Sequence, residues 1–147
     1  MLEPFTEEYF MKKALEEAKA AFNKGEVPVG AVITAGGKII ARAHNLTETL
    51  NDVTAHAEMQ AITAAANLLG GKYLDDCTIY VTVEPCLMCA GALGWAQVGK
   101  IVFGATDEKK GFRKFSEKAL HPKTEIKGGV LEEECSELIK LFFRNKR

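Results

Sequence analysis

The sequence of 147 residues lacks an apolar run of the roughly 18 residues that a membrane-spanning helix needs. Its first residues, Met1-Leu2-Glu3-Pro4, also lack the basic and then apolar pattern of a secretory signal. Hydrophobic residues make up 47% and charged residues 27%, which is typical of soluble globular domains. We therefore expect one cytoplasmic domain over residues 1–147, with a single core and no membrane partner.

Cysteine is scarce, because the chain has only Cys77, Cys86, Cys89 and Cys135. In a reducing compartment a Cys-x-x-Cys pair binds metal or carries redox chemistry more often than it forms a structural disulfide. A second such pair is missing, which argues against a zinc ribbon. A thioredoxin-like function for Cys86 and Cys89 would leave the distant His56 unexplained, and we expect Cys77 and Cys135 to be ordinary buried residues.

A strong excess of one charge is also missing, since the net charge of −1 does not by itself indicate a nucleic-acid partner. The charges are unevenly distributed, however. Residues 1–99 carry 7 Lys/Arg against 12 Asp/Glu, whereas residues 100–147 carry 12 against 8. A basic final third would suit a polyanion, but solvated lysines on loops would give the same count, so both interpretations stay open.

The hydrophobic periodicity predicts a mixture of helices and strands in one α/β domain. Thr6 is placed to cap the first helix, with Phe5 and Phe10 as a hydrophobic staple. Helices are predicted over residues 6–23, 56–69, 85–95 and 131–144, and strands over residues 30–35, 38–44, 78–83, 101–103 and 125–127.

The connections indicate how these strands pair. Gly36-Gly37 offers the backbone freedom of a two-residue hairpin turn, so the first two strands should be antiparallel neighbours. The strand, helix and strand over residues 78–103 form a βαβ unit, which predicts a parallel pair with a right-handed crossover. Residues 104–124 are expected to form a loop with about one helical turn near residues 114–120.

Two predicted helices begin at residues that bind metals. His56 opens the second helix and Cys86 opens the third, with Cys89 one turn further on. Alone, His56 would more often be a packed or capping histidine. Helix N-termini gather outside the carboxyl ends of the strands in such a sheet, so the three side chains can converge. Three ligands suit a catalytic zinc site, because a closed structural site uses four and a catalytic one leaves a position for water.

Glu58, two residues after His56, would place a carboxyl group beside this metal site. On a regular helix Glu58 would point about 200° away from His56, so both can reach one site only if His56 lies at the non-helical start. Glu58 would take a proton from zinc-activated water and deliver it to the departing group, which is hydrolytic deamination in outline. The two motifs, His-x-Glu and Pro-Cys-x-x-Cys, are together the known signature of zinc nucleobase deaminases.

Over nearly its whole length the sequence resembles the bacterial tRNA-specific adenosine deaminases of the cytidine deaminase superfamily. The resemblance implies a three-layer α/β/α sandwich around a five-stranded mixed sheet, a homodimer, and one zinc ion per subunit. The segments that carry it are Glu26-Val-Pro-Val-Gly-Ala-Val32, Asn45, Thr54-Ala-His-Ala-Glu58, Glu84-Pro-Cys-Leu-Met-Cys-Ala-Gly-Ala92, Val102-Phe-Gly-Ala105 with Asp107, and Phe142-Phe143-Arg144.

The resemblance also implies a reaction and a set of site residues. The reaction is hydrolytic deamination of adenosine to inosine at the wobble position of a tRNA anticodon stem-loop, in an arginine tRNA with the anticodon ACG. Zinc would be bound by His56, Cys86 and Cys89, and Glu58 would shuttle the proton. The implied substrate contacts are Val29, Asn45 (bound nucleotide), Ala57, Asp107 (ribose next to the flipped base) and Phe143.

Two departures from the family pattern keep alternatives open. The run Gly111-Phe-Arg-Lys-Phe-Ser116 replaces a Gly-Ala-Ala-Gly-Ser run, and its Phe112 and Phe115 could stack on unpaired bases or anchor the loop. The run Gly94-Trp95-Ala-Gln97 replaces the polar residues that are usual in the family, and a tryptophan here is similar to the related guanine deaminases. We expect Trp95 to lie in the core or in a dimer interface. The alternatives are a small-molecule deaminase acting on guanine or cytosine, and a non-catalytic, zinc-stabilised RNA-binding module.

Overall fold

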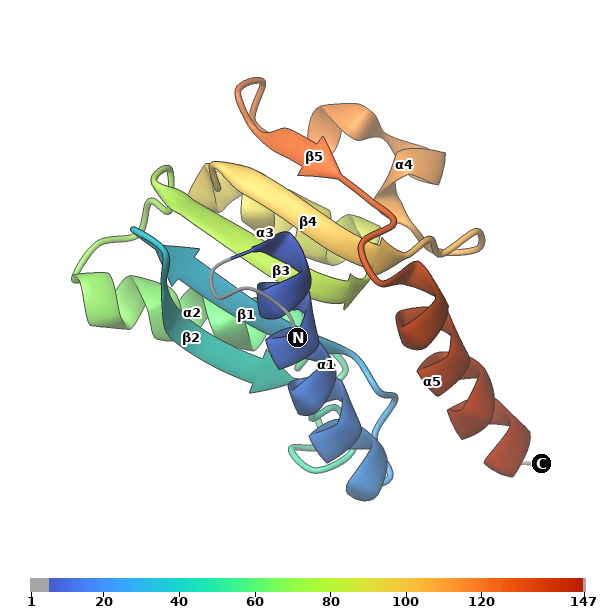
Figure 1. The fold of residues 1–147 in the computed structure, drawn as a ribbon. Coiled ribbons are helices and arrows are strands. Elements are labelled where there is room, and N and C mark those ends of the chain that lie inside the picture. The colour runs from blue at the N-terminus through green and yellow to red at the C-terminus, as the bar shows by residue number, and fades with distance from the viewer. Residues whose placement is uncertain (1–5, 147) are drawn as a thin grey trace.

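A five-stranded mixed sheet forms the centre of the molecule (Figure 1). The computed structural model describes residues 6–146, and the strand order is β2-β1-β3-β4-β5. β1 pairs antiparallel with both β2 and β3, whereas β3, β4 and β5 are parallel. The strands are β1 (Gly30–Ala35), β2 (Lys38–His44), β3 (Cys77–Val83), β4 (Lys100–Ala105) and β5 (Glu125–Lys127).

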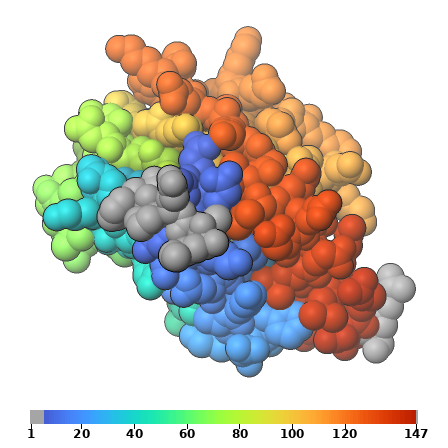
Figure 2. Space-filling view, in the orientation of Figure 1, coloured from blue at the N-terminus to red at the C-terminus, as the bar shows by residue number. Residues whose placement is uncertain are grey.

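Helices cover both faces of this sheet and complete three layers (Figure 1). One face carries α2 (Ala57–Leu69) and α3 (Leu87–Ala96), and the other carries α1 (Glu7–Asn23) and α5 (Glu132–Asn145). Figure 2 shows α1 and α5 next to each other on the near face, where the rings of Phe22 and Phe142 meet edge to face at 5.8 Å. Between β4 and β5 lie the short α4 (Phe112–Phe115) and the 3₁₀ turn η1 (Glu117–Ala119). The predicted fold class is confirmed.

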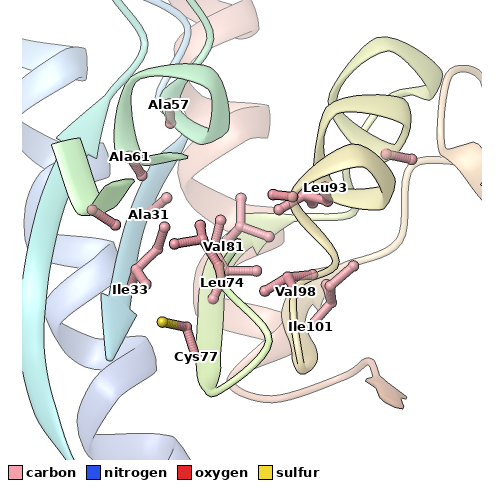
Figure 3. Packing of buried hydrophobic residues seen from close by; sticks show 14 of the residues in the cluster. Ala31, Ile33, Ala57, Ala61, Leu74, Cys77, Val81, Leu93, Val98 and Ile101 are labelled. Carbon is pink, nitrogen blue, oxygen red and sulfur yellow. The ribbon is translucent and has the colours of Figure 1, made fainter. Parts of the chain in front are cut away.

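Burial on both sheet faces follows the two-residue alternation of strands. Ala31 and Ile33 of β1 point toward α2 and α3, while Val32 points to the opposite face. Figure 3 shows the first of these two cores, in which strand and helix side chains interdigitate with Leu74 and Leu93. Because both faces are covered, β1 and β3 are buried along almost their whole length.

The sequence-based boundaries agree with the structure at most elements. Thr6 caps α1 by accepting a hydrogen bond from the Tyr9 amide, and Gly36 and Gly37 form the hairpin turn with φ of 58° and 76°. The parallel pairing of β3 with β4 is also confirmed. The proposed staple involves Phe5, which lies outside the described residues.

Two expectations were wrong in detail, and a third is narrowed. Pro85 precedes α3 instead of lying in its first turn, because its carbonyl accepts from the Phe112 amide and Cys86 forms a bridge with Gly111. The helical turn expected near residues 114–120 begins earlier, at fully buried Phe112, and extended backbone at residue 116 separates α4 from η1. Trp95 is 86% exposed in this chain, which excludes the core and leaves the dimer interface as the expected position.

None of the helices in the described part of the chain combines the length and the apolar character needed to cross a bilayer.

The close packing of α1 on β1 gives a test of the fold. A side chain at Gly30 would overlap the backbone of α1 at Ala14 and Ala18. We predict that Gly30→Ala lowers the free energy of unfolding by about 3 kcal/mol. The control is Gly71→Ala, where a methyl group meets nothing within 4 Å. Equal denaturant midpoints for the two variants would contradict this packing.

Candidate active site

His56 and Cys86 both occupy the N-cap position of a helix, and this places them at one edge of the sheet. Their backbones are extended, with φ/ψ of −72°/157° at His56 and −72°/172° at Cys86. Neither side chain caps its own helix. The extended backbone at His56 also explains how His56 and Glu58, two positions apart, can face one site, because only Glu58 lies within the regular helix α2. The prediction that His56 lies at the non-helical start is confirmed.

The side chains of His56, Cys86 and Cys89 converge on one point. His56 Nδ1 lies 3.7 Å from Cys86 Sγ and 3.5 Å from Cys89 Sγ. All three donor atoms lie within 4.8 Å of one another. A tetrahedral zinc ion with ordinary bond lengths would separate its nitrogen and sulfur ligands by roughly 3.6 Å. The three residues therefore form a cluster that could hold a metal ion, and its donor set and spacing fit zinc.

Hydrogen bonds within the cluster make Cys86 the first of the three side chains to carry a negative charge. The pKa of Cys86 falls to about 4, because hydrogen bonds from Cys89 and His56 to its sulfur outweigh the cost of burial. The pKa of Cys89 is raised by its hydrogen bond with Cys86 and by burial, so Cys86 ionises first. The pKa of His56 is raised, chiefly by its hydrogen bond with Cys86. Two helix N-termini beside the cluster also favour negative charge.

Glu58 lies next to this cluster, and little of it reaches solvent. Its side chain is buried, and burial raises its pKa to about 7. Glu58 lines a pocket that also reaches His56 and Cys86. A buried carboxyl group that holds and releases a proton near neutrality has the chemistry of a general acid and base.

The pocket above Glu58 has a volume of about 390 Å³, within the usual range for small-molecule sites. Four of the five substrate contacts implied by the resemblance line it, and the fifth, Phe143, lines an adjoining groove of about 1100 Å³. The pocket lining comprises Val27, Val29, Asn45, Thr47, His56, Ala57, Glu58, Val83, Glu84, Cys86, Asp107 and Lys110.

Asn45 is more than a turn former. It is only 6% exposed, and its Oδ1 has no hydrogen-bond partner among the described residues. Its Nδ2 has a single long contact of 3.5 Å to Thr47 Oγ1. Because buried polar atoms are rarely left unpaired, this acceptor in the pocket wall is available to a hydrogen-bond donor that enters the pocket.

Two buried carboxylates hold the pocket walls, and sequence reasoning did not assign them a role. Glu26 accepts hydrogen bonds from the amides of Glu48 and Thr49 and from the Thr49 hydroxyl, at 2.6–3.0 Å. Glu84 accepts from the amides of Asp107 and Arg113. Each acid has an apolar neighbour in the sequence, Val27 after Glu26 and Val83 before Glu84, and a single acid in such a place is the available signal of a buried, paired carboxylate.

Fold and site together define a deaminase of the cytidine deaminase-like class. Residues 5–147 match the family model of the MafB19-like deaminases. The tRNA-specific adenosine deaminase of Bacillus subtilis (strain 168) is 49% identical over 146 residues, which cover 96% of this chain and 91% of that protein. A solved structure from work on A-to-I editing by tRNA:A34 deaminases is 41% identical, with a TM-score of 0.83, covering 88% of this chain and 98% of that chain.

The similarity extends to a guanine deaminase. The structure of guanine deaminase from Bacillus subtilis is 44% identical, with a TM-score of 0.66, but covers only 69% of this chain and 65% of that chain. The tRNA-specific adenosine deaminase of Bacillus subtilis exceeds this guanine deaminase both in identity and in the share of the chain that is covered. The chain belongs to the family of tRNA-specific adenosine deaminases, and the resemblance found in its sequence is confirmed.

The hydrogen bonds that Glu26 accepts should make the free energy of unfolding depend on pH. Burial disfavours ionisation of Glu26, but the hydrogen bonds from Thr49, Glu48 and Thr47 outweigh burial and lower its pKa below the ordinary value of 4.5. A lowered folded pKa stabilises the protein above pH 4.5, and this stabilisation is lost as the pH falls further. We predict that Glu26→Gln lowers the free energy of unfolding by about 2 kcal/mol at pH 7.

The difference between Glu26→Gln and wild type should shrink when denaturant unfolding is repeated below pH 4.5. Glu137→Gln, at an exposed position on α5, is the matched control and should leave the curve unchanged. If Glu26→Gln lowers the free energy of unfolding by the same amount down to the lowest pH, the ionised Glu26 does not stabilise the fold in this way.

Proposed function

We propose that this protein converts adenosine to inosine at the wobble position of a tRNA anticodon. The observation that supports this substrate most strongly is that the pocket above Glu58 adjoins a much larger groove. Pocket and groove share Val29, Asp107 and Lys110 in their walls. A free base would need only the pocket, whereas a nucleotide in a chain would also need room for its neighbours. The names of the similar proteins support the same substrate.

The groove is lined by four lysines and by three acids, Asp107, Glu108 and Glu132, which leaves it slightly basic. Lysines contribute to it from two separate segments, the loop after β4 and helix α5, and phosphate binding depends on such charges. Phe143 adds an aromatic ring that is 52% exposed, which suits stacking on an unpaired base. An anticodon loop presents bases that are already unpaired, so extracting one of them costs little. The groove lysines are Lys109, Lys110, Lys140 and Lys146.

Zinc is the metal that we propose, one ion per subunit, held by His56 Nδ1 and the sulfurs of Cys86 and Cys89. When bound, it supplies the Lewis acidity that brings the pKa of water toward neutrality. Glu58 takes the proton of the attacking water and returns it to the amine, so that water and adenosine give inosine and ammonia. The free Asn45 Oδ1 accepts a hydrogen bond from the nucleotide, while Val29 and Ala57 flank the base and Asp107 contacts the adjacent ribose.

An arginine tRNA with the anticodon ACG is the substrate that we propose to test first, and the cytoplasm, where tRNA is processed, is the proposed location. Two other functions remain as test outcomes. The partial similarity to a guanine deaminase favours assays with guanine and cytosine. A non-catalytic RNA-binding module would have no use for the proton-holding Glu58.

A direct assay measures inosine in an ACG anticodon stem-loop incubated with metal-loaded protein. We predict that Glu58→Gln lowers kcat by about 10²–10⁴-fold while keeping its metal, because only the proton transfer is lost. Cys89→Ala should lose both metal and activity, and Glu137→Gln should match wild type. Ammonia released from guanine, cytosine or free adenosine, with none from the RNA, would instead favour the small-molecule alternative.

We also propose that the protein is a homodimer. α2 and α3 cover the same sheet face and carry large apolar side chains in contact with solvent, including Trp95 at 86% and Leu68 at 64% exposure. Light scattering at micromolar concentration should give twice the chain mass of 16.1 kDa. Trp95→Lys should shift the mass toward the monomer, whereas Leu141→Lys on α5 should not. A monomeric wild type would contradict the proposal.

A further inference from the structure

Residues 106–110 form one wall of the groove, and two of them, Asp107 and Lys110, also line the pocket. Residues 111–113 continue this segment and tie it to the turn that carries Cys86. The Phe112 amide donates to the Pro85 carbonyl at 2.9 Å, and Gly111 forms a β-bridge with Cys86. Within the segment, the Gly111 amide donates to the Asp107 carbonyl at 2.9 Å. The wall and the metal-binding turn are therefore joined through backbone contacts.

One buried carboxylate joins both ends of this segment. Glu84 Oε1 accepts from the Asp107 amide at 3.2 Å, and Glu84 Oε2 accepts from the Arg113 amide at 3.1 Å. The Glu84 side chain is 2% exposed. Space around it is also filled, since a side chain at Gly111 would overlap the carboxyl group of Glu84. The position of the wall is thus set by Glu84, which lies two residues before Cys86.

Arg113 provides the charged partner of Glu84. Its Nε donates to Glu84 Oε2 and its Nη2 to Glu84 Oε1, each at 3.2 Å, which is a two-point fork. Nη2 also reaches the Thr106 hydroxyl at 3.2 Å, at the opposite end of the segment. The guanidinium lies 4.8 Å from the centre of the buried Phe103 ring. Arg113 itself lines neither the pocket nor the groove, as the described residues define them.

We propose that Arg113 is a positioning residue that fixes the substrate-binding wall relative to the metal-binding turn through the carboxylate of Glu84. We call the hydrogen-bonded pair of Arg113 and Glu84 the clamp. Its expected effect on kinetics rests on the function proposed above, whereas the clamp itself is a property of the fold. A lysine at position 113 would keep the charge and lose the fork. Arg113 belongs to the run Gly111-Phe-Arg-Lys-Phe-Ser116, in which this chain departs from the usual family pattern.

Hydrogen exchange tests the clamp without any assay of activity. In Arg113→Ala and Arg113→Lys, amides of residues 104–112 should exchange about tenfold faster than in wild type, because the wall loses its charge-assisted hydrogen bonds. The matched control is Lys118→Ala, which removes an exposed cation from the neighbouring turn η1. Wild-type exchange in Arg113→Lys would overturn the proposal.

Kinetics on the anticodon stem-loop separate positioning from direct phosphate binding. Both Arg113 variants should raise KM about tenfold while metal content stays at the wild-type level, because the groove wall is displaced and the metal ligands are not. Their KM should keep the salt dependence of wild type, since no phosphate contact is lost. A normal KM in Arg113→Lys, or a shallower salt dependence in Arg113→Ala, would instead make Arg113 a phosphate contact and overturn the proposal.

The two proposals fail differently. If wild-type protein produces no inosine, the proposed function is wrong, and the exchange comparison still decides whether the clamp exists. If wild type is active and both Arg113 variants show wild-type exchange and KM, the clamp is wrong while the proposed function stands.

Discussion

The site depends on one constraint, which is the extended backbone at the N-caps of α2 and α3. At His56 and Cys86 the chain leaves a loop and enters a helix, and both helices start at the same edge of the sheet. This geometry turns two residues 30 positions apart into neighbours, with Nδ1 and Sγ at 3.7 Å. It also lets Glu58, inside the regular helix, face the same point as His56. A regular helix through His56 would separate them.

The three buried glutamates near the site show how one residue type serves different purposes. Glu26 accepts hydrogen bonds from the amides of Glu48 and Thr49, and these bonds hold the loop that follows Asn45. Glu84 is paired with Arg113 and holds the opposite wall. Glu58 is buried beside the metal-binding cluster, and burial raises its pKa to about 7. Two acids therefore hold the walls of the pocket, and the third remains available to move a proton.

Sequence reasoning could reach the fold and the metal cluster because their signals are local. Gly36-Gly37, the βαβ order and the helix-opening positions of His56 and Cys86 are visible in short segments. The contact between Glu84 and Arg113 spans 29 residues and depends on how a loop folds back, which no periodicity encodes. The same is true of the orphaned Asn45 Oδ1 and of Pro85, whose carbonyl is bound by a residue far along the chain.

The central claim is that a water molecule, deprotonated with the help of Glu58, replaces the amine of an unpaired adenosine. The most direct measurement is mass spectrometry of the anticodon stem-loop after reaction in ¹⁸O-enriched water. The account predicts inosine whose base oxygen carries the solvent label, with one ammonia released for each inosine formed. Adenosine left unchanged by metal-loaded protein, or inosine without the label, would contradict the account.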